Sequence, residues 1–384
     1  MTSAFFSSAE LDARVARARQ DIDAAGYSAL VVASPEDIYY LTGLNHQGHF
    51  AVTVLVVPRD GPLLLVARAM EAPTMAAQVP QCVHVPYADD QDPAAALADV
   101  VRSVAAAGSE VGVEMTSMSL PVSVWEPLQS ILTSVHFDDS SGLVARLRQV
   151  KSPAEITFVR RAAEASSRAM EAGLAAVKDG VSQHEVVAAV YAEMILAAKE
   201  YPAMAPLIRS RHTLLQEHVG WDDQPVASGD ALFFELSASV GRYHAPLTRM
   251  AYLGEPPPGT GVAASIATAG LEAVRDALQP GALATDVYDA WQAVVDDRLG
   301  HSDYRRHHCG YVVGIGFPPT WTGGAGVVGL RRGSDMEIRE GMTFHVLSWL
   351  LDQEPADFVL SDTMLVTADG GEILTTTRRD PIVV

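Results

Sequence analysis

A glutamate in the middle of an apolar strand is the residue of this chain best placed to do chemistry. Glu235 lies between Phe234 and Leu236, where a carboxylate is costly unless it is partnered or functional. Apolar surroundings raise the pKa of a carboxyl group, which suits it to act as a base or a nucleophile. The alternative is a buried structural glutamate paired with Arg242 or Arg249. We expect the catalytic role.

The elements before residue 148 alternate between helical and strand patterns. Residues 8–26 have helical spacing and lead into the short apolar run 29–33, and two further strands are expected at 52–57 and 62–67. A helix-rich segment at 92–107 and a strand at 111–114 continue the alternation. The pattern predicts an α/β domain over residues 1–147.

The elements that must position Glu235 belong to a second domain, residues 148–384. A capping box with proline at the first helical position, Ser152-Pro-Ala-Glu155, opens one helix, and Ser182-Gln-His-Glu185 opens another. Strand pairs then alternate with helices expected at about 260–278 and 285–299. This predicts an α+β domain with two related halves.

Composition limits the classes of partner. The chain has 384 residues and a formal net charge of −20, which argues against nucleic acid because phosphate binding rests on basic patches. No apolar run reaches the length that a membrane span needs, and the N-terminus lacks the pattern of a signal peptide. The two cysteines, Cys82 and Cys309, form no metal or disulfide pattern. A cytoplasmic protein is the expectation.

Several long strings in the second domain resemble those of one enzyme family. They are Trp221-Asp-Asp-Gln-Pro225, Arg242-Tyr-His-Ala-Pro-Leu-Thr-Arg249, Pro318-Pro-Thr-Trp321 and Gly341-Met-Thr-Phe-His345. In these strings the chain looks like the ectoine hydrolases, a branch of the creatinase/prolidase-like superfamily. The resemblance implies a creatinase-type α/β N-terminal domain followed by an α+β pita-bread (creatinase/aminopeptidase) catalytic domain.

Metal-dependent members of that superfamily hold their metal through five side chains. The matching positions here are Glu235, Pro246, Tyr311, Leu347 and Ser361. A hard dication needs several carboxylate or imidazole ligands that converge on it, and proline and leucine offer none. We therefore expect no metal and no cofactor.

The resemblance also assigns roles to histidines and arginines. His218 lies eleven residues before Gly229, the distance at which creatinase places its catalytic histidine, and a loop histidine can move protons near neutral pH; a plain surface histidine is the alternative. The expected substrate-binding residues are His244, Tyr311, Arg242, Trp321 and His345.

Several of these residues could instead have a structural role. His244 and Tyr311 either donate hydrogen bonds to the substrate or only fill the space of the former ligands. Arg242 and Arg249 could bind a substrate carboxylate, although Arg249 matches an arginine common across the superfamily and is expected to be structural. Trp321 is a pocket wall or a core residue.

The resulting expectation is a metal-independent hydrolase of a C–N bond in a small cyclic amidine or amide amino-acid derivative. Ectoine, opened to N-acetyl-diaminobutyrate, is the model substrate. One alternative is a metal-dependent lyase or peptidase whose ligands are Glu235, His244, His307 and His345, and another is a non-catalytic pita-bread binding protein. The resemblance implies a homodimer whose Tyr40–Phe50 loop approaches the other subunit's site.

Overall fold

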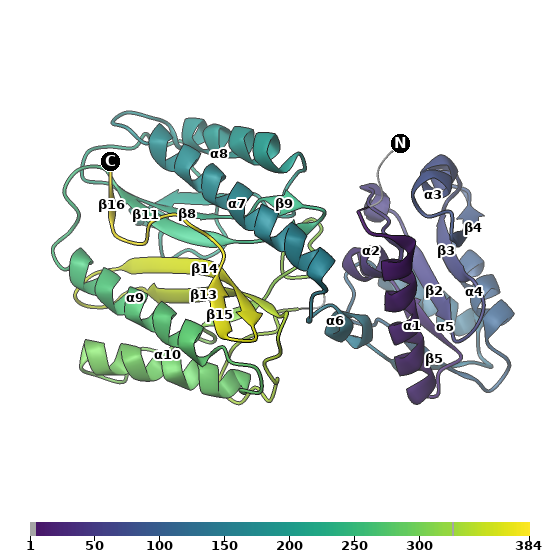
Figure 1. Cartoon of the computed structure of the whole chain (residues 1–384). Coiled ribbons are helices and arrows are strands. Elements are labelled where there is room, and N and C mark those ends of the chain that lie inside the picture. The colour runs from purple at the N-terminus through teal and green to yellow at the C-terminus, as the bar shows by residue number, and fades with distance from the viewer. Residues whose placement is uncertain (1–4, 325) are drawn as a thin grey trace. The chain divides into compact units, whose positions relative to one another are not determined.

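A computed structural model describes residues 5–324 and 326–384 of the chain, which divides into two compact units (Figure 1). The first unit ends at Arg148 and also takes in Gly323–Gly326, and the second comprises Gln149–Thr322 and Val327–Val384. Of the helices in these described ranges, none is long and apolar enough to cross a bilayer.

The first unit is built on a six-stranded mixed sheet with the order β4-β3-β2-β1-β5-β6. Its strands are β1 (Ala29–Val32), β2 (Val54–Pro58), β3 (Leu63–Arg68), β4 (Cys82–Tyr87), β5 (Glu110–Val113) and β6 (His136–Asp139). The central strands β1 and β2 are buried along their whole length. Both strands are continuous apolar runs, the pattern typical of strands that are covered on both faces of the sheet.

Helices and short 3-10 turns complete the first unit. They are α1 (Ser8–Ala24), α2 (Pro35–Thr42), η1 (Gly48–Phe50), η2 (Ala69–Glu71), α3 (Ala72–Gln78), α4 (Pro93–Val104), α5 (Val122–Ile131) and α6 (Leu143–Leu147). Side chains cap two of these helices at the start: Ser7 accepts from the Glu10 amide and Asp92 from the Ala94 amide.

The second unit contains an eight-stranded sheet whose main path is β12-β13-β14-β11-β8-β7. Strand β15 extends it beside β14, and β16 pairs with β11. The bounds are β7 (Leu207–Ser210), β8 (Ala231–Leu236), β11 (Leu247–Tyr252), β12 (Gly310–Val312), β13 (Thr343–Leu350), β14 (Phe358–Thr367), β15 (Gly370–Ile373) and β16 (Ile382–Val383). A separate two-stranded ribbon joins β9 (Ser239–Val240) to β10 (Tyr243–His244), and η3 (Arg211–Thr213) follows β7.

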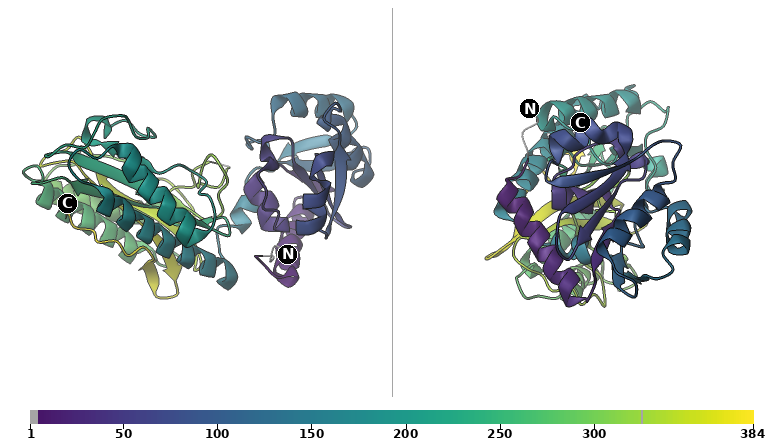
Figure 2. Two further views of the ribbon diagram at one scale, coloured as in Figure 1. Left: turned by 90° about the horizontal axis from the view of Figure 1, so that it is seen from above. Right: turned by 90° about the vertical axis from the view of Figure 1, so that its right-hand side faces the viewer.

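Two pairs of helices pack on this sheet: α7 (Pro153–Ala176) with α8 (Gln183–Ala198), and α9 (Thr260–Ala277) with α10 (Ala284–Leu299). Both capping boxes are formed, with Ser152 and Glu155 at the start of α7 and Ser182 and Glu185 at the start of α8. The four predicted helices are thereby confirmed. In Figures 1 and 2 the long helix α7 runs across the sheet of its unit.

The helix pairs occupy one face of the sheet and leave the other for the site. Phe234 of β8 belongs to the apolar core under α7 and α8, and the indole of Trp291 in α10 donates to Ser348 of β13 at 3.0 Å. Because neighbouring residues of a strand point to opposite faces, Glu235 and Leu347 lie on the opposite, inner face.

Close packing of the first helix pair depends on a glycine. A Cβ atom at Gly173 of α7 would lie 2.5 Å from Cγ2 of Val190 and 3.1 Å from the ring of Phe234. The missing side chain lets α7, α8 and β8 approach, and this contact sets the position of the strand that carries Glu235.

Candidate active site

Five strands bring one residue each into a row across the inner face of the sheet. Glu235 of β8 is the register partner of Leu207 on one side and of Thr248 on the other. Thr248 is opposite Ser361, and Ser361 is opposite Leu347. Directly opposed residues of antiparallel strands share a face, so the row holds one carboxylate, two hydroxyls and two leucines.

Glu235 is a buried carboxyl group without a hydrogen-bond partner. Its side chain is 8% exposed, and it makes no hydrogen bond with any residue of the described ranges. Burial raises its pKa to about 7; Arg209 and Arg306 oppose this rise and Glu217 adds to it. Near neutral pH, Glu235 can therefore both hold and release a proton.

A chain of hydrogen bonds ends beside this carboxyl group. The indole of Trp321 donates to the Tyr311 hydroxyl at 2.9 Å, and that hydroxyl lies 2.8 Å from Nδ1 of His345. Nε2 of His345 is 2.6 Å from the Ser361 hydroxyl, which in turn donates to Thr248 at 2.7 Å. The sheet thus brings three predicted substrate-binding residues together.

The donors in this chain assign the tautomer of His345. Since the Ser361 proton goes to Thr248, Ser361 accepts from Nε2–H, and Nδ1 accepts from the Tyr311 hydroxyl. Burial lowers the pKa of His345 to about 3, which keeps the ring neutral. Nδ1 lies 4.0 Å from Oε1 of Glu235, too far for a hydrogen bond.

The donor set of this face does not fit a divalent metal ion. Pro246 and Leu347 carry no donor atom, while the hydroxyls of Tyr311 and Ser361 bond to His345. Among the residues with described positions, no three His, Cys, Asp or Glu side chains are grouped so that they could hold a metal. One carboxylate is too few ligands for a hard dication.

His244 contacts main-chain groups through both of its ring nitrogens. The fully buried ring accepts from the Ala203 amide at Nε2, at 3.0 Å, and Nδ1 lies 3.0 Å from the Arg242 carbonyl. This pattern makes Nδ1 the protonated nitrogen, and burial lowers the pKa of His244 to about 3. Both ring nitrogens are therefore committed to main-chain groups.

Arg242 and His218 lie apart from the hydrogen-bond chain around His345. The guanidinium of Arg242 stacks 3.9 Å from the ring centre of Tyr201 and 5.0 Å from that of Phe317. His218 is exposed, has a left-handed backbone with φ of 59°, and hydrogen-bonds to no residue of the described chain. A left-handed non-glycine residue marks a constrained loop.

His218 lines a pocket of about 480 Å³ that reaches the row of Glu235. The pocket walls include Met204, Trp221 and Pro319, and its floor includes Leu207. Because Leu207 is the register partner of Glu235, the loop of His218 lies over the strand next to the carboxylate. No direct contact between His218 and Glu235 is formed in the described structure.

Sequence reasoning missed a buried arginine beside this row. Arg209 of β7 is 1% exposed, and its guanidinium carbon lies 4.0 Å from the ring centre of Phe233. Phe233 packs edge-on against Trp349, with ring centres 5.5 Å apart. The local signal was weak, because Arg209 follows Leu207-Ile208 but is itself followed by the polar residues Ser210 and Arg211.

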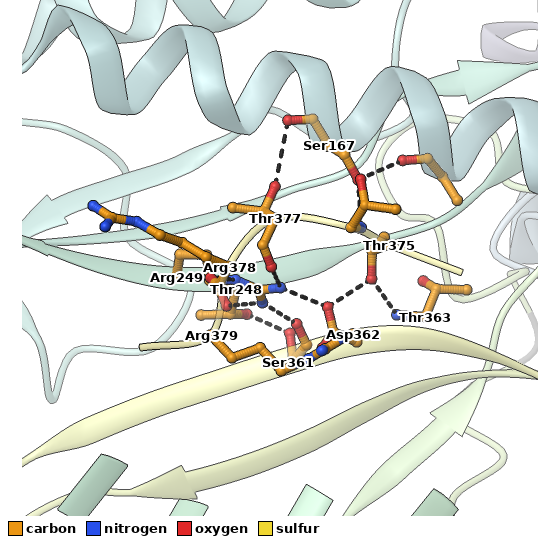
Figure 3. Close-up of polar contacts among 12 residues, drawn as sticks. Ser167, Thr248, Arg249, Ser361, Asp362, Thr363, Thr375, Thr377, Arg378 and Arg379 are labelled. Carbon is orange, nitrogen blue, oxygen red and sulfur yellow. Dashed lines mark hydrogen bonds and ion pairs between the residues drawn. The ribbon is translucent and has the colours of Figure 1, made fainter. Parts of the chain in front are cut away.

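A second buried network fixes the strands that carry Thr248 and Ser361 (Figure 3). Arg249 donates to Asp362 at 2.7 Å and to the carbonyls of Ser361 and Thr377. Asp362 also accepts from the Thr375 hydroxyl and from Arg379, both at 2.6 Å. Asp362 is therefore occupied by structural bonds, and Arg249 has the structural contacts expected of it.

Comparison with known proteins now identifies the family. Residues 157–368 match the model of metallopeptidase family M24, and residues 14–150 match the creatinase/prolidase N-terminal domain. The chain belongs to metallopeptidase family M24. The predicted membership of the creatinase/prolidase superfamily and the predicted fold class, α/β followed by α+β pita-bread, are both confirmed.

Relatives of this M24 chain include both named and uncharacterised hydrolases. An uncharacterised hydrolase or peptidase of Sinorhizobium fredii is 29% identical over 98% of each chain. The ectoine hydrolase of Halomonas elongata is 27% identical over 96% of each chain. The crystal structure of the Thermococcus sibiricus prolidase has a TM-score of 0.86 and 20% identity, and covers 98% of this chain and 100% of its own. At this level the chain is a hydrolase of family M24.

Proposed function

We propose that this M24 hydrolase cleaves a C–N bond in a small cyclic amidine or amide amino-acid derivative without a metal ion, and that Glu235 is the central catalytic group. One observation carries the proposal. Glu235 is a buried carboxyl group without a hydrogen-bond partner on the inner face of the sheet, and the neighbouring positions among the described residues offer too few metal ligands. The similarity to an ectoine hydrolase supports the substrate class.

The chemistry of an amidine suits such a site. A protonated cyclic amidine already has an electrophilic carbon between its two nitrogens, so it needs less polarisation than a neutral carbonyl. A carboxylate attracts this cation, whereas a dication would repel it. A pKa of about 7 leaves a large share of Glu235 deprotonated at neutral pH, which is the form that acts on the substrate.

Hydrolysis then requires one bond to form and one to break. The oxygen of water adds to the amidine carbon, a C–N bond breaks, and the departing nitrogen takes up a proton. Glu235 either removes a proton from the water or attacks the carbon first and is released by water. With ectoine, ring opening gives N-acetyl-diaminobutyrate.

The remaining site residues have unequal support. Tyr311, His345 and Trp321 form the polar wall next to Glu235 through hydrogen bonds of 2.8 and 2.9 Å. We assign proton transfer to His218, whose pocket shares Leu207 with the row of Glu235. Arg242 and His244 act on substrate binding through the position of the 201–206 loop, because His244 holds the Ala203 amide.

The test combines product detection with metal analysis on purified protein. Incubation with ectoine should yield a product heavier by one water, detected by mass spectrometry, and dialysis against EDTA should leave the rate unchanged. The metal content should be far below one ion per chain. Tightly bound stoichiometric iron, zinc or manganese on which activity depends would contradict the proposal.

A peptidase is the second candidate function, supported by the name of the Sinorhizobium relative and by the fold shared with the prolidase. A peptidase should cleave an Xaa-Pro dipeptide, and this activity should appear only when Mn²⁺ is added. Such activity, together with no conversion of ectoine, would favour the peptidase over the amidine hydrolase.

A further inference from the structure

Two buried donor groups near Glu235 lack acceptors. Nε of Arg209 and Nε1 of Trp349 make no hydrogen bond in the described part of the chain, although both atoms are buried. The other two guanidinium nitrogens of Arg209 reach the carbonyls of Leu214 and Val219 only at 3.4 and 3.5 Å. A buried donor left without a partner costs free energy, so such atoms mark a place for an acceptor.

Both donors belong to side chains that pack on the same ring. Arg209 stacks on Phe233 at 4.0 Å, and Trp349 meets that ring edge-on at 5.5 Å. Arginine and tryptophan side chains are donors only. A group that satisfies them must therefore be an acceptor, and the charge of Arg209 favours a carboxylate.

Glu235 presents the complementary charge on the same face of the sheet. It lies two residues from Phe233 on β8, and Arg209 is the register partner of Phe233. Alternate residues of a strand are about 7 Å apart, a span that one small molecule can cover. The two side chains influence each other electrostatically, yet they form no ion pair, although both lie in the described chain.

Two opposite charges buried side by side without pairing are costly unless something else neutralises them. The contacts of Arg209 explain how they are kept apart. The stack on Phe233 and the two long bonds to the carbonyls of Leu214 and Val219 hold the guanidinium in place without an ion pair to Glu235.

From these contacts we propose that the site takes a zwitterion. Arg209, with the indole of Trp349, binds the carboxylate of the substrate, while Glu235 faces its cationic amidine. This inference rests on the proposed function for the bond that is cleaved, and it adds Arg209 as the residue that selects amino-acid derivatives over simple amidines.

The test compares two rings that differ only in the carboxylate: ectoine and 2-methyl-1,4,5,6-tetrahydropyrimidine. The wild type should prefer ectoine in kcat/KM, and Arg209→Gln should reduce this preference by about 10- to 100-fold, the range for a hydrogen-bonded charge. Arg209→Lys, which keeps the charge but loses the planar fork, should fall between the two. Arg160→Gln, at an exposed pair with Glu372, is the control and should change neither rate.

The preference between the two rings separates recognition from folding. If Arg209 only supports the loop, Arg209→Gln lowers both rates alike and the preference is unchanged, which would overturn the inference. Calorimetric titration of the wild type keeps the test independent of turnover. Selective binding of ectoine without hydrolysis would refute the proposed function and uphold the zwitterion site. Hydrolysis of both rings at equal kcat/KM would uphold the proposed function and refute the zwitterion site. Failure to bind any carboxylated ring, L-pyroglutamate included, would also refute the zwitterion site.

Discussion

At the scale of single residues, the environment of Glu235 departs from that of an ordinary buried carboxylate. Such groups usually accept several hydrogen bonds or pair with a cation, whereas the nearest ring nitrogen of His345 is 4.0 Å away. The charges of Arg209 and Arg306 offset the cost of burying this carboxyl group only in part, which is the expected state of a group held ready for a substrate.

This environment predicts a dependence of stability on pH. The folded-state pKa of Glu235 is raised from 4.5 to about 7, so its contribution to stability is fully present below pH 4.5 and is lost as the pH rises through about 7. The loss amounts to about 3 kcal/mol. The free energy of unfolding in urea should be compared for Glu235→Gln and the wild type. Between pH 5 and pH 8 the difference should shift in favour of the variant by up to this amount.

A surface glutamate provides the control for this measurement. Glu372 pairs with Arg160, which holds its pKa below the ordinary value, so its charge stays constant between pH 5 and pH 8. The stability gap between Glu372→Gln and the wild type should be independent of pH in that window. A gap for Glu235→Gln that is equally flat would contradict the pKa of about 7.

At the scale of elements, buried networks hold the strands that build the row. The carboxylate of Asp362 in β14 forms ion pairs with Arg249 of β11 and with Arg379 of the C-terminal segment. These bonds fix Thr248 against Ser361, because each hydroxyl residue directly precedes a member of the network.

Asp362→Asn should therefore destabilise the protein strongly. The substitution keeps the shape but leaves Arg249 buried without its counter-charge, which costs about 3–5 kcal/mol. Glu372→Gln, at the exposed Arg160 pair, should cost less than about 1 kcal/mol. If the two variants lost the same free energy of unfolding in urea, the buried Arg249–Asp362 pair would contribute no more to stability than the exposed pair.

How far the sequence alone reaches also differs between elements. Long helices with capping boxes, such as α7, were predictable because several local signals agree. Strands β4 and β6 were missed, since β4 is only partly buried and β6 is the polar run His136-Phe-Asp-Asp139. Edge strands of this kind carry no apolar alternation to detect.

In the candidate site, too, some features could be predicted from local sequence signals and others could not. Glu235 stood out as a charge in an apolar strand, and the family resemblance named Tyr311, Trp321 and His345 as substrate-binding residues, which stays a prediction. The bond from His345 to Ser361 depends on the register of β13 against β14, which no local pattern encodes. Arg209 carried only a weak local signal, and its pairing with Phe233 also needs the strand register.

At the scale of the whole molecule, the family resemblance leads us to propose a homodimer. The Tyr40–Phe50 segment, expected near the partner's site, runs from the end of α2 through η1 rather than as a loop, and its last residue, Phe50, is 83% exposed. An apolar side chain so exposed is typical of an interaction surface when neighbouring groups add to it. Light scattering at micromolar concentration should give the mass of two chains.

Phe50→Asp should shift this equilibrium toward the monomer by placing a charge in the proposed interface. Leu196→Asp, which changes an apolar residue of α8 that is 71% exposed, should leave the mass unchanged. A wild-type monomer, or an identical response of the two variants, would contradict the proposed role of the segment.

Turnover of ectoine by the Glu235→Gln variant tests whether Glu235 is the catalytic group. Glutamine keeps the size of the side chain but removes both its charge and its basicity. The rate should fall by about 10²-fold or more, the scale of a positioned acid–base group, while circular dichroism shows the fold intact. If the folded variant hydrolysed ectoine at a rate near that of the wild type, Glu235 would not be the catalytic group.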